Sequence, residues 1–301
     1  MKRLLALLLL LSLLLTAPLG ALGEEAAAPA DGAEERHVIN LIEDPDAEYA
    51  FQEGVTLLEV YFPEIFGADA CILRFGEETM LIDAATVGQA PIVMETMARL
   101  GVDHLNIAFN THPHDDHIMG FQQLPEDMQV DKFVIAFPED ENRPMRTTLR
   151  VIRERGIPIE RVKNGSEMML GDVRMVVMQK DFTSYTINNR SAALMVFYGD
   201  RRLLMAADIE THAQGSLNKK PPEFGLKADI LKYPHHGVAK AGWKFLENVD
   251  AELAIVTSKL VSIDETVADS EKRGLPLVSS VPGIVRLRTD GVIWVVDRID
   301  P

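Results

Sequence analysis

The segment Thr111-His112-Pro113-His114-Asp115-Asp116-His117 follows a short apolar run, which is typical of a loop that leaves a buried strand. His112 and His114 are alternate residues, so an extended backbone directs both imidazoles toward one cation. Asp116 and His117 open the next predicted helix and face a neighbouring cation. Imidazole and carboxylate suit Zn²⁺ or Mn²⁺, and an open coordination position would hold an acidified water. The alternative is a polar loop whose histidines only form hydrogen bonds.

Asp208 is a second candidate metal ligand. It follows the apolar residues 203–207 and has no obvious basic neighbour in the sequence. A carboxylate at the end of a buried strand needs a partner, and a metal ion would supply one. The alternative is that Asp208 caps a helix over residues 209–217. The residue pattern by itself leaves both interpretations open.

The stretch Tyr233-Pro234-His235-His236-Gly237 again follows a predicted strand. Adjacent histidines cannot both face one point in an extended backbone. We therefore expect one of them to bind a metal ion and the other to support the site or transfer a proton. A pair of surface histidines without a metal is the alternative.

Short apolar runs alternate with turn signals from about residue 50 onward and predict a series of strands. Residues 70–83 read as a hairpin, and Asp290-Gly291 turns a second hairpin near the end of the chain. A helix is predicted near residues 147–155. Strands interleaved with helices predict an α/β layered domain, and no repeat or linker divides residues 50–301.

In their order along the chain, these motifs resemble those of the metallo-β-lactamase superfamily. The motifs are H-x-H-x-D-H at residues 112–117, a strand ending in Asp208, and K-x-P-H-H-G at 232–237. The sequence is most similar to the branch that contains the C-terminal domain of ComEC-type competence proteins and related secreted hydrolases. The resemblance covers nearly all of residues 50–260. It implies a four-layer αββα sandwich with the metal site at one edge, and hydrolysis of a phosphodiester or related ester.

The resemblance also implies roles for individual residues. Zn²⁺ is the expected cofactor, as one or two ions, with Mn²⁺ as the alternative. Asp116 would also orient the nucleophilic water, and His235 would donate a proton to the leaving group. Asp83, in a stretch that resembles the family's early strand, is expected to be structural. The expected metal ligands are His112, His114, Asp116, His117, Asp208 and His236.

One feature departs from the family pattern. Members with two complete metal sites usually carry another histidine between the H-x-H-x-D-H motif and the bridging aspartate. Here no histidine occurs from residue 118 to 211. Asn188 and Asn189 are poor replacements, because amides are weak ligands for Zn²⁺. Of the two metal sites, the one that contains Asp116 and His117 is therefore expected to have the more complete set of ligands.

Composition limits the substrates and partners. The chain has 30 Lys and Arg against 46 Asp and Glu, a net charge of −16, so we expect no binding of long nucleic acid. A small anionic or ester substrate remains compatible, because a bound cation is locally positive. The single cysteine excludes an intrachain disulfide framework.

Two alternative functions stay open: a lactam or lactone hydrolase at the same site, and a catalytically inactive module that binds a metal or ligand.

The N-terminus predicts export. Lys2 and Arg3 precede an apolar run over residues 4–15 and a segment of small residues, the pattern of a secretory signal peptide over residues 1–23. The apolar run is shorter than the roughly 20 residues that span a bilayer, so no stable membrane insertion is expected after its removal. Residues 24–49 are expected to form a flexible leader before the hydrolase domain at 50–301. The predicted location is therefore secreted, or extracellular.

Overall fold

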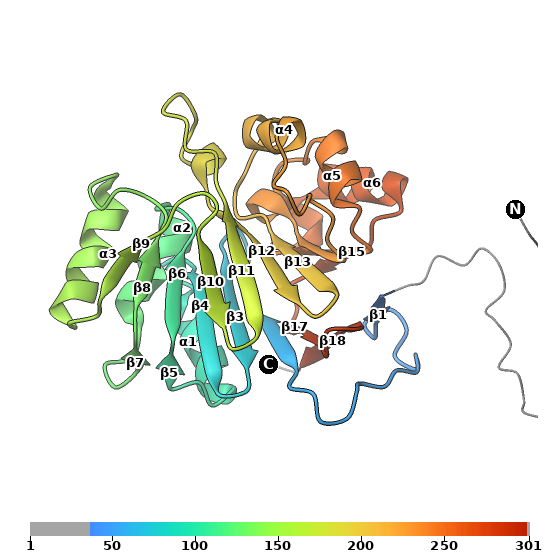
Figure 1. The fold of residues 1–301 in the computed structure, drawn as a ribbon, viewed down its shortest axis with the longest axis horizontal. Helices are drawn as coiled ribbons and strands as arrows, with labels where there is room; N and C mark the ends of the chain where they lie inside the picture. The colour runs from blue at the N-terminus through green and yellow to red at the C-terminus, as the bar shows by residue number, and fades with distance from the viewer. Residues whose placement is uncertain (1–36, 300–301) are drawn as a thin grey trace, which may run out of the picture. The chain divides into compact units, whose positions relative to one another are not determined.

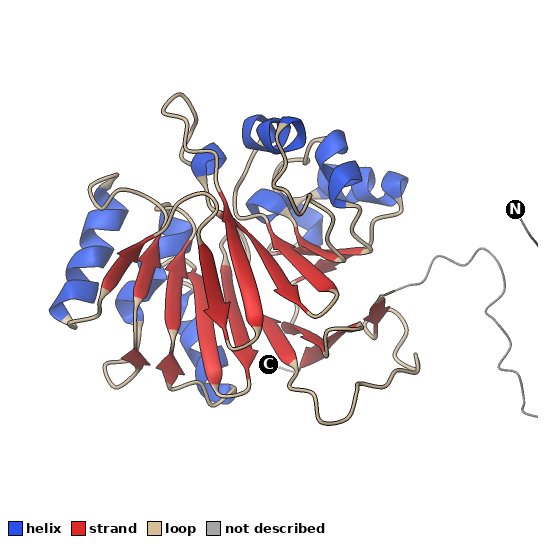
Figure 2. Cartoon of the chain, viewed as in Figure 1, coloured by secondary structure: helices blue, strands red, loops and turns tan. Residues whose placement is uncertain are grey.

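The computed structural model describes residues 37–299. The predicted signal peptide and the first part of the predicted leader lie outside the described residues. Figure 1 shows the strands gathered at the centre, and Figure 2 shows the helices flanking them. Among the described residues, no helix has the length and apolar character needed to cross a membrane.

One sheet carries the first half of the predicted site. Its strands β4, β6, β8 and β9 are parallel to one another, whereas β17, β2, β3 and β4 pair antiparallel. A parallel edge pair of β1 and β18 completes it. In spatial order the nine strands are β1 (Val38–Asn40), β18 (Trp294–Ile299), β17 (Ile284–Thr289), β2 (Leu58–Phe62), β3 (Ala70–Phe75), β4 (Glu78–Ala84), β6 (Ile107–Asn110), β8 (Phe133–Ile135) and β9 (Ile159–Arg161).

The other large sheet carries the second half of the site. It is antiparallel from β10 to β13 and parallel from β13 to β16. In order its strands are β10 (Glu167–Leu170), β11 (Val173–Met178), β12 (Ala193–Tyr198), β13 (Arg201–Met205), β14 (Ile230–Lys232), β15 (Leu253–Val256) and β16 (Leu277–Ser279). A small separate pair joins β5 (His104–Leu105) to β7 (Gln129–Val130).

Side chains of the second sheet alternate between two apolar cores. In β13, Leu203 and Met205 belong to the larger core, which contains residues of both sheets, and Leu204 belongs to a smaller core. The smaller core also contains Phe245 of α5 and Leu217 of α4, so the helices cover this outer face. Successive strand residues point to opposite faces, and a sheet buried on both sides reads as a continuous apolar run.

The helices complete the outer layers. Val93 of α1 and Leu149 of α3 are buried in the larger core, while α4 and α5 pack on the smaller one. This arrangement is the predicted α/β four-layer αββα sandwich. The helices are α1 (Ala90–Arg99), α2 (Asp115–Ile118), α3 (Arg143–Glu154), α4 (Thr211–Lys219), α5 (Trp243–Val249) and α6 (Asp264–Arg273), with 3₁₀ turns η1 (Met119–Gln123), η2 (Asn188–Arg190), η3 (Pro234–Gly237) and η4 (Leu260–Ser262).

Part of the predicted leader lies in the fold. Strand β1 pairs with β18, so the folded chain begins before residue 50, the boundary expected from the sequence. The carboxylate of Glu252 accepts hydrogen bonds from the backbone N–H groups of His37 and Val38. The backbone N–H of Trp294, the first residue of β18, donates to the carbonyl oxygen of His37 at 2.7 Å. These bonds fix an edge strand that the composition of residues 24–49 does not indicate.

Candidate metal centre

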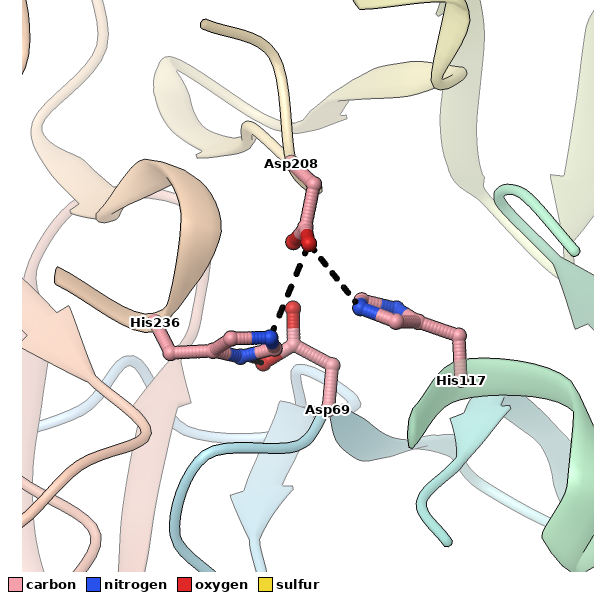
Figure 3. A group of neighbouring side chains, drawn as sticks. All are labelled: Asp69, His117, Asp208 and His236. Atoms are coloured by element: carbon pink, nitrogen blue, oxygen red, sulfur yellow. Dashed lines mark hydrogen bonds and ion pairs between the residues drawn. The ribbon is translucent and has the colours of Figure 1, made fainter. Parts of the chain in front are cut away.

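Four chain segments meet at one edge of the two sheets. Strand β4 ends just after Asp83, and β6 leads directly into residues 111–117. In the other sheet, β13 leads into Asp208 and β14 leads into His235 and His236. β4 and β6 are parallel, as are β13 and β14, so within each pair the carboxyl ends lie together. Figure 3 shows two of the side chains that follow these strands, His117 and His236, directed toward Asp208.

His117 is fixed by the sheet beneath it. Its Nδ1 atom lies 2.7 Å from Oδ2 of Asp83, and the hydroxyl of Thr111 donates to the same carboxylate oxygen at 2.6 Å. Its other ring nitrogen, Nε2, faces Oδ2 of Asp208 at 3.3 Å. A histidine whose Nδ1–H is held by a carboxylate offers the lone pair of Nε2 to a metal ion. Asp83 therefore has the structural place that the sequence predicts for it.

His236 has the equivalent arrangement from the opposite side. Its Nδ1 lies 3.0 Å from Oδ1 of Asp69, and its Nε2 lies 3.3 Å from Oδ2 of Asp116 and 3.6 Å from Oδ2 of Asp208. Asp69 also contacts the ammonium group of Lys232. Asp69 is not among the residues predicted from the sequence. The available signal was Lys232, which is buried within a predicted strand and therefore needs a counter-charge.

Asp208 is shared by two possible ligand groups. In the first, Asp69, His117, Asp208 and His236 each offer an atom, and these atoms lie within 4.8 Å of one another. In the second, His112 and His114 join Asp208 under the same criterion. Nε2 of His112 lies 3.1 Å from Nδ1 of His114 and 3.7 Å from Oδ2 of Asp208. A carboxylate between two such groups is placed to bridge two cations.

His235 and His236 both face Asp208. The expectation that only one of them could do so assumed an extended backbone. Both residues instead adopt left-handed conformations, with φ of 51° and 55°. As a result, Nε2 of His235 lies 3.7 Å from the same Asp208 oxygen that His236 approaches at 3.6 Å. Strained backbone of this kind is concentrated at functional sites.

The alternative interpretation of Asp208 as a helix cap is wrong. Helix α4 begins at Thr211, and its capping position is Glu210. Asp208 lies outside the helix, with only 1% of its surface exposed, and its Oδ2 is directed at the histidines. The two asparagines considered as substitutes for the missing histidine differ. The Asn189 side chain is engaged by Glu210, Thr186 and the backbone of Ala213. Nδ2 of Asn188 also donates to Glu210, but it lies 3.4 Å from Nε2 of His235.

The donor atoms fit a divalent cation. Nε2 of His117, Nε2 of His236 and Oδ1 of Asp208 are buried and lack a hydrogen-bond partner among the described residues. Buried polar atoms without partners are costly, and a cation among them would satisfy all three. Two imidazoles with carboxylates form a ligand set that Zn²⁺ and Mn²⁺ accept.

The electrostatics of the site lead to the same conclusion. Burial raises the pKa of Asp208, but the imidazoles of His117 and His236 outweigh it and hold that pKa well below its usual range. Burial lowers the pKa of His236, whereas the carboxylates of Asp69 and Asp208 raise it, to about 9. The pKa of Asp116 falls to about 2, because the opposing effect of burial is exceeded by its contact with His236. Protonated imidazoles thus balance carboxylates that a metal ion would otherwise neutralise.

A family model described as the metallo-beta-lactamase superfamily matches residues 66–258, which is more than half of the chain. The chain belongs to the metallo-β-lactamase superfamily. The family predicted from the three sequence motifs is thereby confirmed. The fold and the His/Asp cluster agree with the expected class of enzyme, a hydrolase of this superfamily with a candidate metal site.

Individual relatives support this membership. The chain is 26% identical over 174 residues to ComE operon protein 3 of Bacillus subtilis (strain 168), which agrees with the ComEC-type branch. The match covers 56% of this chain but only 22% of that protein, so the chain spans about a fifth of its relative's length.

Two solved structures share the fold of this superfamily member. The metallo-beta-lactamase fold protein YhfI from Bacillus subtilis superposes with a TM-score of 0.51 at 11% identity, covering 74% of this chain and 95% of that one. A mutant of CmlA beta-hydroxylase gives a TM-score of 0.52 at 14% identity and covers 80% of this chain and 55% of that one. At these identities, the likeness concerns the fold alone.

Proposed function

We propose that this protein is a secreted, metal-dependent hydrolase that acts on a small phosphodiester or a related ester. The observation that carries the proposal is Asp208, a buried carboxylate that lies between the His117–His236 group and the His112–His114 group. Within residues 37–299, one Asp208 oxygen and the imidazole nitrogens beside it have no hydrogen-bond partner. A superfamily fold with this convergence of ligands supports metal-assisted hydrolysis.

Zn²⁺, as one or two ions, is the proposed cofactor, and Mn²⁺ suits the same donors. When bound, such a cation supplies a Lewis acid that acidifies water and neutralises charge on the substrate oxygen. His117, Asp208 and His236 would hold one cation together with Asp116, and His112, His114 and Asp208 would hold a second. The ligand atoms come from separate loops fixed by strands, so they are organised before a cation enters.

Two further side chains are placed for proton and water handling. Asp116 is partly exposed, with one oxygen directed at His236, so its carboxylate can accept a hydrogen bond from a water at the site and orient it. The His235 ring is 26% exposed, in contrast to the buried His236 ring. Nδ1 of His235 lies 3.6 Å from a Glu210 oxygen. We assign Nε2 of His235 as the atom that donates a proton to the leaving group. The local positive charge of a cation would attract an anionic substrate, whereas the net charge of −16 opposes a long polyanion.

Export is proposed from residues 1–23 alone, which carry the pattern of a signal peptide. Expression of the full chain in a bacterial host, followed by fractionation and N-terminal sequencing, tests it. Recovery of a chain shortened by about 23 residues outside the cytoplasm would support secretion. A full-length chain retained in the cytoplasm would contradict it.

Hydrolysis is tested with the purified chain, elemental analysis and a panel of reporters. Bis-(4-nitrophenyl) phosphate represents phosphodiesters, and chromogenic lactone and lactam reporters represent carbonyl substrates. We expect turnover of the phosphodiester and its loss by more than about 100-fold in Asp208→Ala. Asp127→Ala, which removes an exposed carboxylate, is the matched control.

Each other outcome has a defined meaning. Preference for the carbonyl reporters would assign a lactam or lactone hydrolase to the same site. A bound ion without turnover of any reporter would indicate a module that binds metal and has no catalytic activity. Unchanged activity in a folded Asp208→Ala variant, checked by circular dichroism, would exclude the metal mechanism.

A further inference from the structure

Asp69 is a buried carboxylate beside the candidate metal centre that the proposed hydrolytic mechanism does not use. It lies directly before β3 in the nine-stranded sheet, and the hydrogen-bond partners of its side chain lie in the other sheet and the loops that follow it. Lys232 is the last residue of β14, and Thr257 follows β15. Because Asp69 is among the residues that could hold an ion, its role has to be decided from its contacts.

Both oxygens of Asp69 are already engaged. Oδ2 contacts the ammonium group of Lys232, which is only 2% exposed. Oδ1 lies 3.0 Å from Nδ1 of His236 and accepts a hydrogen bond from the hydroxyl of Thr257 at 2.5 Å. A metal ligand needs a free lone pair that points at the ion. Here one oxygen faces a cation that would repel a second one, and the other is occupied by two donors.

The two nitrogens of His236 separate the ligand side of the ring from its supporting side. Nδ1 faces Asp69, whereas Nε2 faces Asp116 and Asp208 and has no hydrogen-bond partner among the described residues. Figure 3 shows Asp69 and Asp208 approaching His236 from different sides. A carboxylate that accepts the Nδ1–H of an imidazole fixes the tautomer and the ring orientation needed for ligation by Nε2.

We propose that Asp69 is a positioning residue for His236 and not a metal ligand, and that Lys232 keeps it in that role. Lys232 compensates the buried charge of Asp69 and keeps its Oδ2 away from the cation. Thr257 fixes the rotation of the carboxylate. The inference rests on the proposed function only in requiring that the site binds a cation, and it does not depend on the reaction catalysed. It assigns a role to the lysine of the K-x-P-H-H-G motif.

Cobalt binding tests the proposal. Co²⁺ alone is titrated into the metal-free wild-type chain and into a double variant, Asp69→Asn with Lys232→Met, which removes both charges of the buried pair together. The visible absorption of Co²⁺ reports the geometry of each ion. The matched control is Glu160→Gln with Lys132→Met, which neutralises an exposed pair. The metal-free melting temperature of each chain is recorded in parallel.

We expect the double variant to bind one Co²⁺ about 10- to 100-fold more weakly than the wild type, with an altered spectrum for that ion. Binding at the His112–His114 group and in the control variant should be unchanged. A merely structural role would lower the metal-free melting temperature without changing the relative affinities of the two ions. Two ions bound with wild-type affinity and spectrum would overturn the proposal.

A second measurement separates a positioning residue from a ligand and does not depend on any variant. Crystals of the wild-type chain grown with Co²⁺ locate the ion by anomalous scattering. An ion beyond about 3 Å from both Asp69 oxygens supports the proposal, and one at the roughly 2.0–2.2 Å of a carboxylate ligand overturns it. A chain that binds Co²⁺ as expected but hydrolyses no reporter would refute the proposed function and leave this inference standing. A chain that binds no Co²⁺ would refute both.

Discussion

A Cβ atom added to Gly120 would lie 1.7 Å from the backbone carbonyl oxygen of Ala84. The N–H of Gly120 also donates to the carbonyl oxygen of Ala85 at 3.1 Å. Gly120 belongs to η1, which directly follows the short helix α2 that carries Asp116 and His117, while Ala84 ends β4 next to Asp83. This close approach of two backbones therefore holds the H-x-H-x-D-H loop against the strand that orients His117.

Gly120→Ala should destabilise the fold and the site together. The added methyl group would clash with a backbone atom, and a backbone atom cannot move aside as a flexible side chain can. We therefore expect the free energy of unfolding to fall by about 3 kcal/mol. Urea unfolding measures it, and Co²⁺ affinity should fall as well. Gly215→Ala is the control: Gly215 lies within α4 with nothing within 4 Å of an added Cβ, so alanine should stabilise by about 0.5–1 kcal/mol. Equal effects at both positions would contradict the packing argument.

Asp83→Asn should weaken metal binding through His117. Asp83 accepts from the backbone N–H and hydroxyl of Thr111 and from Asn110, in addition to His117. The amide retains one acceptor oxygen but presents an NH₂ group to donors, which misorients the ring of His117. We expect Co²⁺ to bind roughly 10- to 100-fold more weakly at the His117–His236 group, as measured by titration. Unchanged affinity in a folded variant would show that the ring is held by other contacts.

His235→Ala and His236→Ala should separate proton donation from metal ligation. The buried His236 faces Asp116 and Asp208, so its loss should remove one ion, as measured by elemental analysis. Loss of His235 should leave the metal content intact. It should slow esters with poor leaving groups by about 100-fold or more, and nitrophenyl esters less, because only a poor leaving group needs the proton. Loss of an ion in His235→Ala would instead identify His235 as the third imidazole beside His112 and His114.

Metal affinity should increase with pH. Burial lowers the pKa of His236, but Asp69 and Asp208 raise it from 6.5 to about 9. A raised pKa means that protonated His236 stabilises the metal-free fold fully below pH 6.5, and that this stability is lost as pH rises through about 9. A cation needs the neutral ring, so its apparent affinity should rise about tenfold per pH unit for each displaced proton, and level off above the raised pKa.

Calorimetry in buffers of different ionisation enthalpy counts the protons released as Zn²⁺ binds. We expect about one proton or more per ion at pH 7, and fewer in His236→Ala. The melting temperature of the metal-free chain should fall between pH 7 and 9.5. A flat affinity profile over this range would contradict protonated His236 as the group that balances the carboxylates.

Local patterns in the sequence predicted most of the fold. The strand at residues 70–75 appears as β3 with the same bounds, and the turn at Asp290-Gly291 joins β17 to β18. Helix α3 begins at Arg143, earlier than the expected 147, because the side chain of Asn142 accepts a hydrogen bond from the N–H of Met145 and caps it. Strand β1 could not be predicted, since both its partner strand β18 and Glu252, which accepts hydrogen bonds at its start, lie more than 200 residues away.

The candidate site was likewise predicted only in part from the sequence. Motif spacing predicted candidate ligands on loops that directly follow strands, and the structure brings these side chains together around Asp208. It was insufficient for Asp69, whose partners Lys232 and Thr257 lie in the other half of the chain. The orientation of His235 and His236 also depended on tertiary structure, because positive φ at a non-glycine residue is maintained only by its surroundings.

Neither large sheet contains the whole centre. Asp69, Asp83 and His117 lie at or near the ends of individual strands of the nine-stranded sheet, whereas Asp208 and His236 follow strands of the seven-stranded sheet. A cation bound by His117 from one sheet and by Asp208 and His236 from the other would act as a crosslink between the layers, and separating the layers would destroy the binding site. Release of the ion and cooperative melting of the domain should therefore coincide, so added Zn²⁺ should protect strands far from the edge against hydrogen exchange.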